Sequence, residues 1–92
     1  MRIIWKYPLL PDPDQTIQMP SSAKILCVHT QGEHAFLWAE VETASFPAFR
    51  RFRVYRTGEA MIEAPGCDER YVGTFHLAGG SLAFHVYEVF PV

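Results

Sequence analysis

The sequence contains no uninterrupted apolar stretch of the roughly 18 residues that a membrane-spanning helix needs. It has only 2 cysteines, too few for the disulfide frameworks that stabilise small secreted domains. It also has no excess of basic residues, since the formal net charge is −2 and the isoelectric point is about 6.0. We therefore expect no transmembrane helix, two free thiols, and no electrostatic attraction to long nucleic acids or acidic membranes.

Motifs of catalysis and metal binding are missing as well. The histidines match neither HExxH nor the close cysteine–histidine spacing of zinc sites, and there is no P-loop. Cys27 is expected to be buried and inert in the run ILCV, and Cys67 has no evident base beside it. Glu40 and Glu42 share a strand face, but a solvated edge explains them more simply than a catalytic pair. We expect no metal, no cofactor and no enzymatic activity.

What is present is the composition of one small globular domain, residues 1–92. The chain is 49% hydrophobic and 14% aromatic, which is typical of a folded protein. A chain of this length buries roughly 60–65% of its extended surface, enough for a modest core. The opening MRIIWKYPLL is interrupted by Lys6 and followed by prolines, so we interpret it as the first strand of a cytosolic protein and not as a signal peptide.

Alternation of apolar and polar residues predicts strands along almost the whole chain. Residues 24–30 are apolar at nearly every position, which predicts a central strand covered on both faces. Residues 58–69 are irregular, with room for one helical turn at 59–64. About seven short strands with hardly any helix predict an all-β fold, either a small antiparallel β-sandwich or a partly open barrel.

The segment GTFHLAGGSLAFHVYE predicts a hairpin that turns at Gly79 and Gly80. In that register Phe75 pairs with Phe84, and the face that carries them is apolar and should point to the core. The opposite face is mixed and carries both histidines of the segment, so they are candidates for a binding surface or a subunit contact.

The stretch FRRFRVYRTG, residues 49–58, holds four of the chain's 8 basic residues. As a strand it places Arg51, Arg53 and Tyr55 on one face. Guanidinium groups bind phosphate through two parallel donors, and aromatic rings stack on bases, so this face is a candidate site for a flat anionic ligand. On composition alone an equally good interpretation is that the arginines protect an exposed strand and pair with nearby acids such as Glu40.

Two further groups of side chains extend this candidate site. Arg56 and Thr57, at the end of the basic strand, add a cation and a hydroxyl. Near the start of the chain, Trp5 and Tyr7 share a face that packs by default in the core, whereas Lys6 points the other way and is a better ligand contact.

The stretches IIWKYPLL, QTIQMP, AKILCV, LWAEVE, FRVYRTGE and YVGTFHLAGGSLAFHVYE resemble a family of small phage-encoded proteins with the patterns IWKYPL and GTFxLxGGxxxFHV. The likeness covers nearly the whole chain. That family is similar to phage immune-evasion sponges, which sequester the cyclic dinucleotides of CBASS or the cyclic ADP-ribose signals of Thoeris. The resemblance implies binding without cleavage, assembly into a homo-oligomer, and action in the cytoplasm of the infected bacterium.

The sequence thus leads us to expect a phage protein that sequesters a cyclic nucleotide defence signal, in a pocket between subunits because the chain is small. An alternative is a protein–protein interaction module, either an inhibitor of a host protein or a phage accessory or structural protein. A third alternative, a phosphodiesterase, would have to use His76, His85 and scattered acids. The expected ligand contacts are Trp5, Lys6, Tyr7, Arg51, Arg53, Tyr55, Arg56, Thr57 and His85.

Overall fold

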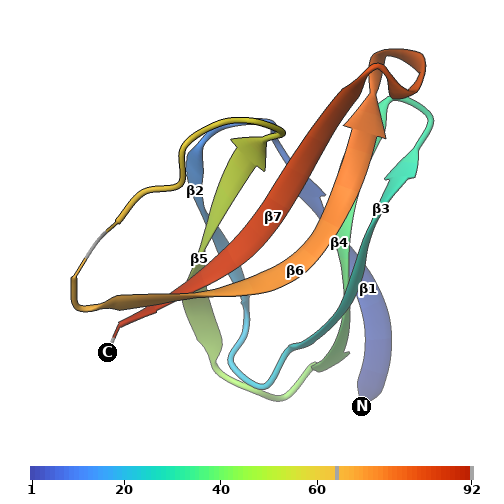
Figure 1. Cartoon of the computed structure of the whole chain (residues 1–92). Helices are drawn as coiled ribbons and strands as arrows, with labels where there is room; N and C mark the ends of the chain where they lie inside the picture. The colour runs from blue at the N-terminus through green and yellow to red at the C-terminus, as the bar shows by residue number, and fades with distance from the viewer. Residues whose placement is uncertain (64, 92) are drawn as a thin grey trace.

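The computed structural model, which describes residues 1–63 and 65–91, consists of two antiparallel β-sheets (Figure 1). The three-stranded sheet has the order β1 (Arg2–Leu9), β4 (His34–Glu42), β3 (Lys24–Gln31). The four-stranded sheet has the order β2 (Asp14–Pro20), β5 (Pro47–Arg56), β7 (Leu82–Pro91), β6 (Cys67–Leu77). The predicted all-β, sandwich-like architecture of about seven strands is confirmed, and the two sheets do not close into a barrel.

Helical structure in the described residues is limited to η1 (Ala78–Gly80), a single 3-10 turn. Within the same residues, no helix has the length and apolarity needed to cross a membrane.

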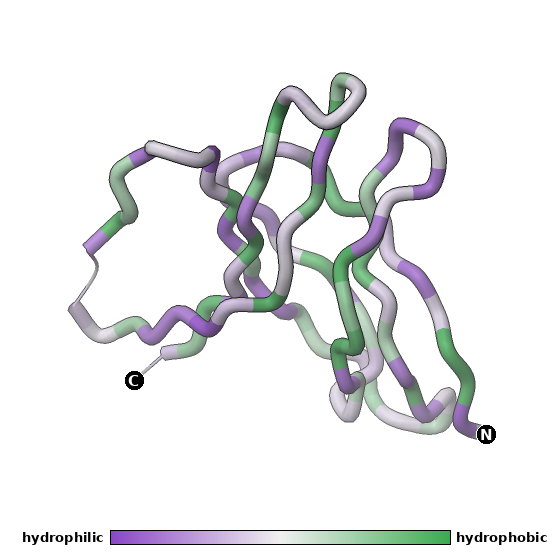
Figure 2. Tube along the Cα trace, turned by 45° about the vertical axis from the view of Figure 1, so that its right-hand side comes forward, coloured by the Kyte–Doolittle hydropathy of each residue, from purple (hydrophilic) through white to green (hydrophobic). Residues whose placement is uncertain are grey.

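The period-two alternation of the strands explains the core. Hydrophobic and hydrophilic positions alternate along the tube in Figure 2, so each strand turns one row of side chains inward. In β4 the inward row is small or aliphatic, with Ala35, Leu37, Ala39 and Val41 all buried. The facing sheet contributes larger groups, and those that are buried include Phe52, Val54, Phe75, Phe84 and Val86.

The two sheets approach each other closely where β6 passes β3. A β-carbon at Gly73 would lie 3.1 Å from the Cβ of Val28, a buried residue of β3. The pairing of β6 with β7 also shifts register between Tyr71 and Gly73, as at a β-bulge. A glycine at this position therefore allows the edge strands of the two sheets to pack directly together.

The prediction of a central strand at 24–30 is wrong, because β3 lies at an edge and β4 is the central strand of its sheet. The register of β3 shifts between Ile25 and Cys27, and both Leu26 and Cys27 are exposed. An apolar run is typical of burial on two faces, but here the irregularity turns part of the run outward. The predicted helical turn is also absent from residues 59–63, and Ala64 lies outside the described residues.

The final hairpin confirms the predicted register, since Phe75 pairs with Phe84 and Thr74 with His85. Its turn is longer than predicted. Pairing ends at Leu77 and Leu82, and the connection between them begins with three successive positive φ angles, at Ala78, Gly79 and Gly80. Two glycines in sequence are favourable there because they adopt this conformation without steric cost.

Candidate functional site

Most arginines of the basic strand β5 form ion pairs with carboxylates from other strands of the same sheet. Arg50 points inward, and its Nε and Nη2 donate to the Glu88 carboxylate at 2.6 and 2.8 Å. Its Nη1 donates to the Ala23 carbonyl at 2.5 Å. The two charged side chains are only 20% and 8% exposed. This ion pair is therefore largely buried, and its guanidinium already binds a carboxylate and a backbone carbonyl.

On the outer face of the sheet, Arg51 donates through Nε and Nη2 to both oxygens of Asp14, at 2.9 and 2.5 Å. The Arg51 guanidinium lowers the pKa of the Asp14 carboxyl from its usual value, chiefly through this hydrogen bond. Both side chains are about half exposed. Arg51 is thus accessible, but its guanidinium already binds the Asp14 carboxylate through two donors.

Arg53 and Tyr55 share the same face but are buried, each with 4% exposure. Arg53 Nη1 donates to Glu69 at 2.5 Å, and the Tyr55 hydroxyl donates to the same carboxylate at 3.0 Å. Burial raises the pKa of Tyr55. The predicted roles of Arg53 in phosphate binding and of Tyr55 in base stacking need correction, because neither side chain is accessible to a ligand in this structure.

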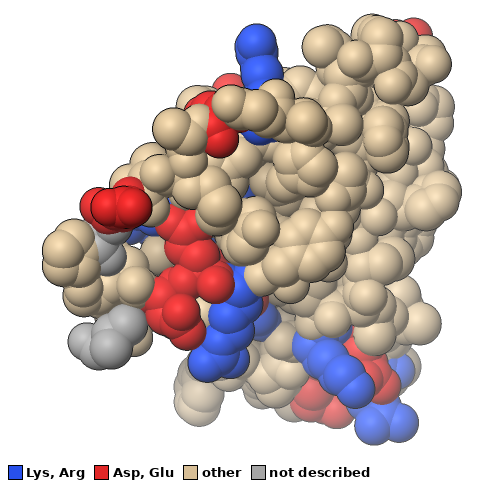
Figure 3. Space-filling view, in the orientation of Figure 1, with Lys and Arg blue, Asp and Glu red and all other residues tan. Residues whose placement is uncertain are grey.

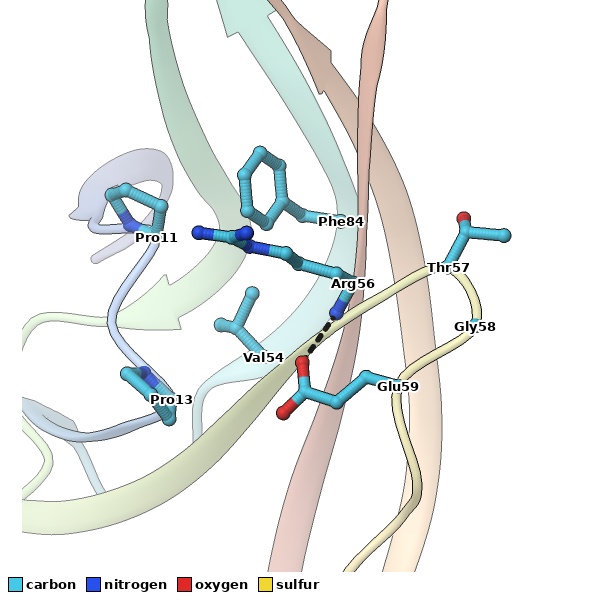
Figure 4. Close-up of a pocket in the computed structure, with 8 residues that line it drawn as sticks. All are labelled: Pro11, Pro13, Val54, Arg56, Thr57, Gly58, Glu59 and Phe84. Atoms are coloured by element: carbon cyan, nitrogen blue, oxygen red, sulfur yellow. Dashed lines mark hydrogen bonds between the residues drawn. The ribbon is translucent and has the colours of Figure 1, made fainter.

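Arg56 differs from the other arginines of β5. Its guanidinium forms no ion pair within residues 1–63 and 65–91. It lines a cavity of about 570 Å³ at the end of the strand, and Figure 4 shows its side chain extending toward Pro11 and Phe84. The cavity is lined by Pro11, Pro13, Val54, Arg56, Thr57, Gly58, Glu59 and Phe84.

A tight turn at residues 56–59 builds the charged rim of this cavity. The Glu59 amide donates to the Arg56 carbonyl at 3.1 Å, and Gly58 has a φ of 87°. A positive φ at the third residue of a turn favours glycine. The Arg56 amide in turn donates to Glu59 Oε1 at 2.9 Å, drawn as the dashed line in Figure 4. One turn therefore presents both a cation and a carboxylate to the cavity.

Thr57 also lines the Arg56 cavity, but its hydroxyl contacts His85 on the outer face of the four-stranded sheet. Thr57 Oγ1 and His85 Nε2 are 2.6 Å apart, and Thr74 Oγ1 is 3.0 Å from His85 Nδ1. The Tyr71 hydroxyl extends this chain to Thr74 at 2.6 Å. In Figure 4 the Thr57 side chain points away from that of Arg56. His85, which was predicted to contact a ligand, is thus hydrogen-bonded to threonine hydroxyls on the outer face of the four-stranded sheet.

The predicted cluster of Trp5, Lys6 and Tyr7 lies in the other sheet and does not join Arg56. Trp5 is more than half exposed, whereas Tyr7 packs against the core and has a pKa raised by burial. Lys6 hydrogen-bonds Gln31, and its ammonium lies 4.5 Å from the ring centroid of Phe36, a cation–π contact. The predicted ligand residues are therefore spread over several separate surfaces.

The other walls of the Arg56 cavity were not predicted from the sequence. Glu59 falls in the segment 58–69, which was predicted only to be irregular. A carboxylate directly after the arginine-threonine-glycine end of the basic strand is the one local signal that could have identified this rim.

Charge is intermixed on the visible surface, where Figure 3 shows acidic and basic side chains next to one another and a broad uncharged area. No three side chains of histidine, cysteine, aspartate or glutamate gather closely enough to hold a metal ion in the part of the chain that the structure describes.

Comparison with known proteins adds a family but no function. No curated protein and no solved structure matches this chain. A family model described as a domain of unknown function, DUF7352, matches residues 1–91. Because that match extends over nearly the whole sequence, the protein belongs to the DUF7352 family.

Proposed function

We propose that this protein binds a small phosphorylated nucleotide and sequesters it without cleaving it. The observation that carries the proposal is Arg56, a guanidinium with no ionic partner in the described residues, in a cavity of about 570 Å³. Ligand sites typically occupy roughly 300–1,000 Å³ and combine apolar walls with a few polar groups. Here proline, valine and phenylalanine supply the apolar walls, and Arg56 supplies a planar set of donors.

The sequence resemblance supports a more specific form of this proposal. The ligand is a cyclic nucleotide signal of bacterial defence, of the cyclic dinucleotide or cyclic ADP-ribose type, and the protein is a phage immune-evasion factor. It acts in the cytoplasm of the infected host, as a homo-oligomer whose neighbouring copies complete the site. Sequestration must outcompete the host receptor, and nanomolar binding corresponds to about −12 kcal/mol.

The test is isothermal titration calorimetry against cyclic dinucleotides and cyclic ADP-ribose isomers. We expect one class to bind at micromolar concentration or tighter, and Arg56→Gln to weaken binding at least tenfold. The matched control is Arg51→Gln, which removes a guanidinium that Asp14 already neutralises. Ligand released by denaturing the complex should be chemically intact. Absence of binding by every compound at 50 μM protein, or recovery of a cleaved product, would overturn the proposal.

Two exposed aromatic residues favour a second function, binding to another protein. Phe46 is 84% exposed and Phe49 is 75% exposed, on either side of the start of β5. Aromatic residues are enriched at protein interfaces, where they supply much of the binding energy. A stoichiometric host protein captured by the wild type, and lost in Phe46→Ser and Phe49→Ser, would support this alternative. Retention of the host protein by both variants would argue against it.

A further inference from the structure

We infer that the Arg56 cavity selects a guanine base, contacted on one edge by Arg56 and on the other by Glu59. The inference rests on the proposed nucleotide-binding function and specifies its ligand. It starts from the two opposite charges at the rim of the cavity. Arg56 and Glu59 form no ion pair with each other, and neither has an ionic partner elsewhere in residues 1–63 and 65–91. Both charges are therefore open to a ligand.

The turn fixes where these charges lie. Glu59 Oε1 accepts the backbone amide of Arg56 at 2.9 Å, which holds the carboxylate at the backbone end of that residue. The Arg56 side chain extends away from this point toward Pro11 and Phe84 (Figure 4). The guanidinium and the carboxylate thus lie at different parts of the cavity, and in this view Val54 is drawn between them.

This arrangement is a poor match for a phosphate group alone. An anion that approached Arg56 inside the cavity would also experience repulsion from the Glu59 carboxylate. The arrangement suits a neutral, flat group that offers acceptors to the guanidinium and N–H donors to the carboxylate at the same time. Phosphate groups of the nucleotide then remain outside the cavity.

Guanine has this pattern of donors and acceptors. Its O6 and N7 accept two parallel bonds from arginine, the commonest specific contact between a side chain and a base. Its N1–H and exocyclic amine lie side by side and can both donate to a carboxylate. Adenine instead places an amine next to N7, where it opposes arginine, and has an unprotonated N1 that opposes glutamate. Pyrimidines have no counterpart to N7.

The walls of the cavity fit the faces of such a base. Pro11, Pro13, Val54 and Phe84 present apolar surface beside the two charged groups. Flat purine rings bury their faces against apolar and aromatic side chains in this way. Selection of guanine separates the two classes of signal proposed above, since a cyclic dinucleotide can contain guanine whereas cyclic ADP-ribose contains adenine.

The experiment compares GMP, IMP and AMP, and then cyclic di-GMP and cyclic di-AMP, by calorimetry at one salt concentration. A bidentate base contact discriminates by roughly 5- to 150-fold, the equivalent of about 1–3 kcal/mol. We expect GMP to bind at least tenfold tighter than AMP, and cyclic di-GMP to show the same preference over cyclic di-AMP. IMP lacks the exocyclic amine, so its affinity should lie between those of GMP and AMP.

Glu59→Gln tests the assignment directly, because an amide keeps one acceptor for the Arg56 backbone but cannot accept two donors from guanine. The preference for GMP over AMP should fall below threefold in Glu59→Gln and stay at the wild-type value in Glu33→Gln, a control on an exposed turn. Thermal unfolding verifies that both variants fold. If nucleotides bind but AMP equals GMP, or if Glu59→Gln keeps the preference, this inference fails and the proposed function stands. If no nucleotide binds, the proposed function fails, and the inference with it.

Discussion

At the scale of single residues, the ion pair between Arg50 and Glu88 places two opposite charges in a largely buried position between the sheets. Removing one partner of a buried pair leaves the other charge uncompensated, at a cost of about 3–5 kcal/mol. We therefore expect Glu88→Ala to lower the free energy of unfolding by about that amount in urea denaturation. Asp14→Ala, which breaks the half-exposed pair with Arg51, should cost no more than about 1 kcal/mol. Equal losses of unfolding free energy in the two variants would show that burial of an ion pair does not determine its contribution to stability.

The pair of Asp14 with Arg51 makes stability depend on pH. The pKa of Asp14 is lowered in the folded protein, so this carboxyl contributes stability that is fully present above its unfolded value of about 3.9. That contribution disappears as pH falls through the lower, folded value. We expect Asp14→Asn to be less stable than the wild type at pH 6 and to converge with it as pH falls below about 3.9. A stability difference that is constant from pH 6 to pH 2.5 would contradict this assignment.

At the scale of elements, the contact between β6 and β3 depends on the missing side chain of Gly73. A methyl group at this position would meet Val28 at 3.1 Å, closer than ordinary van der Waals contact. Overpacking of this kind typically costs about 1–3 kcal/mol, so Gly73→Ala should be destabilising in urea denaturation. The same substitution in a Val28→Gly background should cost less, because glycine removes both the Cβ at 3.1 Å and the Cγ2 at 3.2 Å. If the cost is unchanged in that background, Val28 is not the source of the strain.

The elements also show what could be predicted from the sequence. Strand β4 and the last hairpin were identified because a period of two is a local property of the chain. The edge position of β3 was missed, since an apolar run does not distinguish burial on two faces from an irregular edge strand. The partners of Arg50 and Arg51 were missed because Glu88 and Asp14 are 38 and 37 residues away. Such pairing follows from strand order, which local alternation does not determine.

At the scale of the whole molecule, the chain is flatter than a compact monomer. Its extents are 40 × 36 × 16 Å, and its radius of gyration of 13.5 Å exceeds the value of about 12 Å typical of 92 residues. Its accessible surface of 5987 Å² also exceeds the roughly 5,400 Å² expected for 10.5 kDa. The excess surface, together with exposed aromatic residues such as Phe46, supports the proposed assembly of identical chains.

Light scattering coupled to size-exclusion chromatography tests that assembly. We expect a mass of at least twice the 10.5 kDa of one chain, because a closed dimer is the simplest symmetric way for two copies to cover their exposed Phe46 side chains. Phe46→Ser should shift the mass toward the monomer without loss of folding, since the side chain is 84% exposed and contributes little to the core. The control, Met61→Ser, changes an exposed residue on another loop and should leave the mass unaltered. A wild-type protein that remains monomeric at 100 μM would mean that each Arg56 cavity must bind its ligand without help from a second chain.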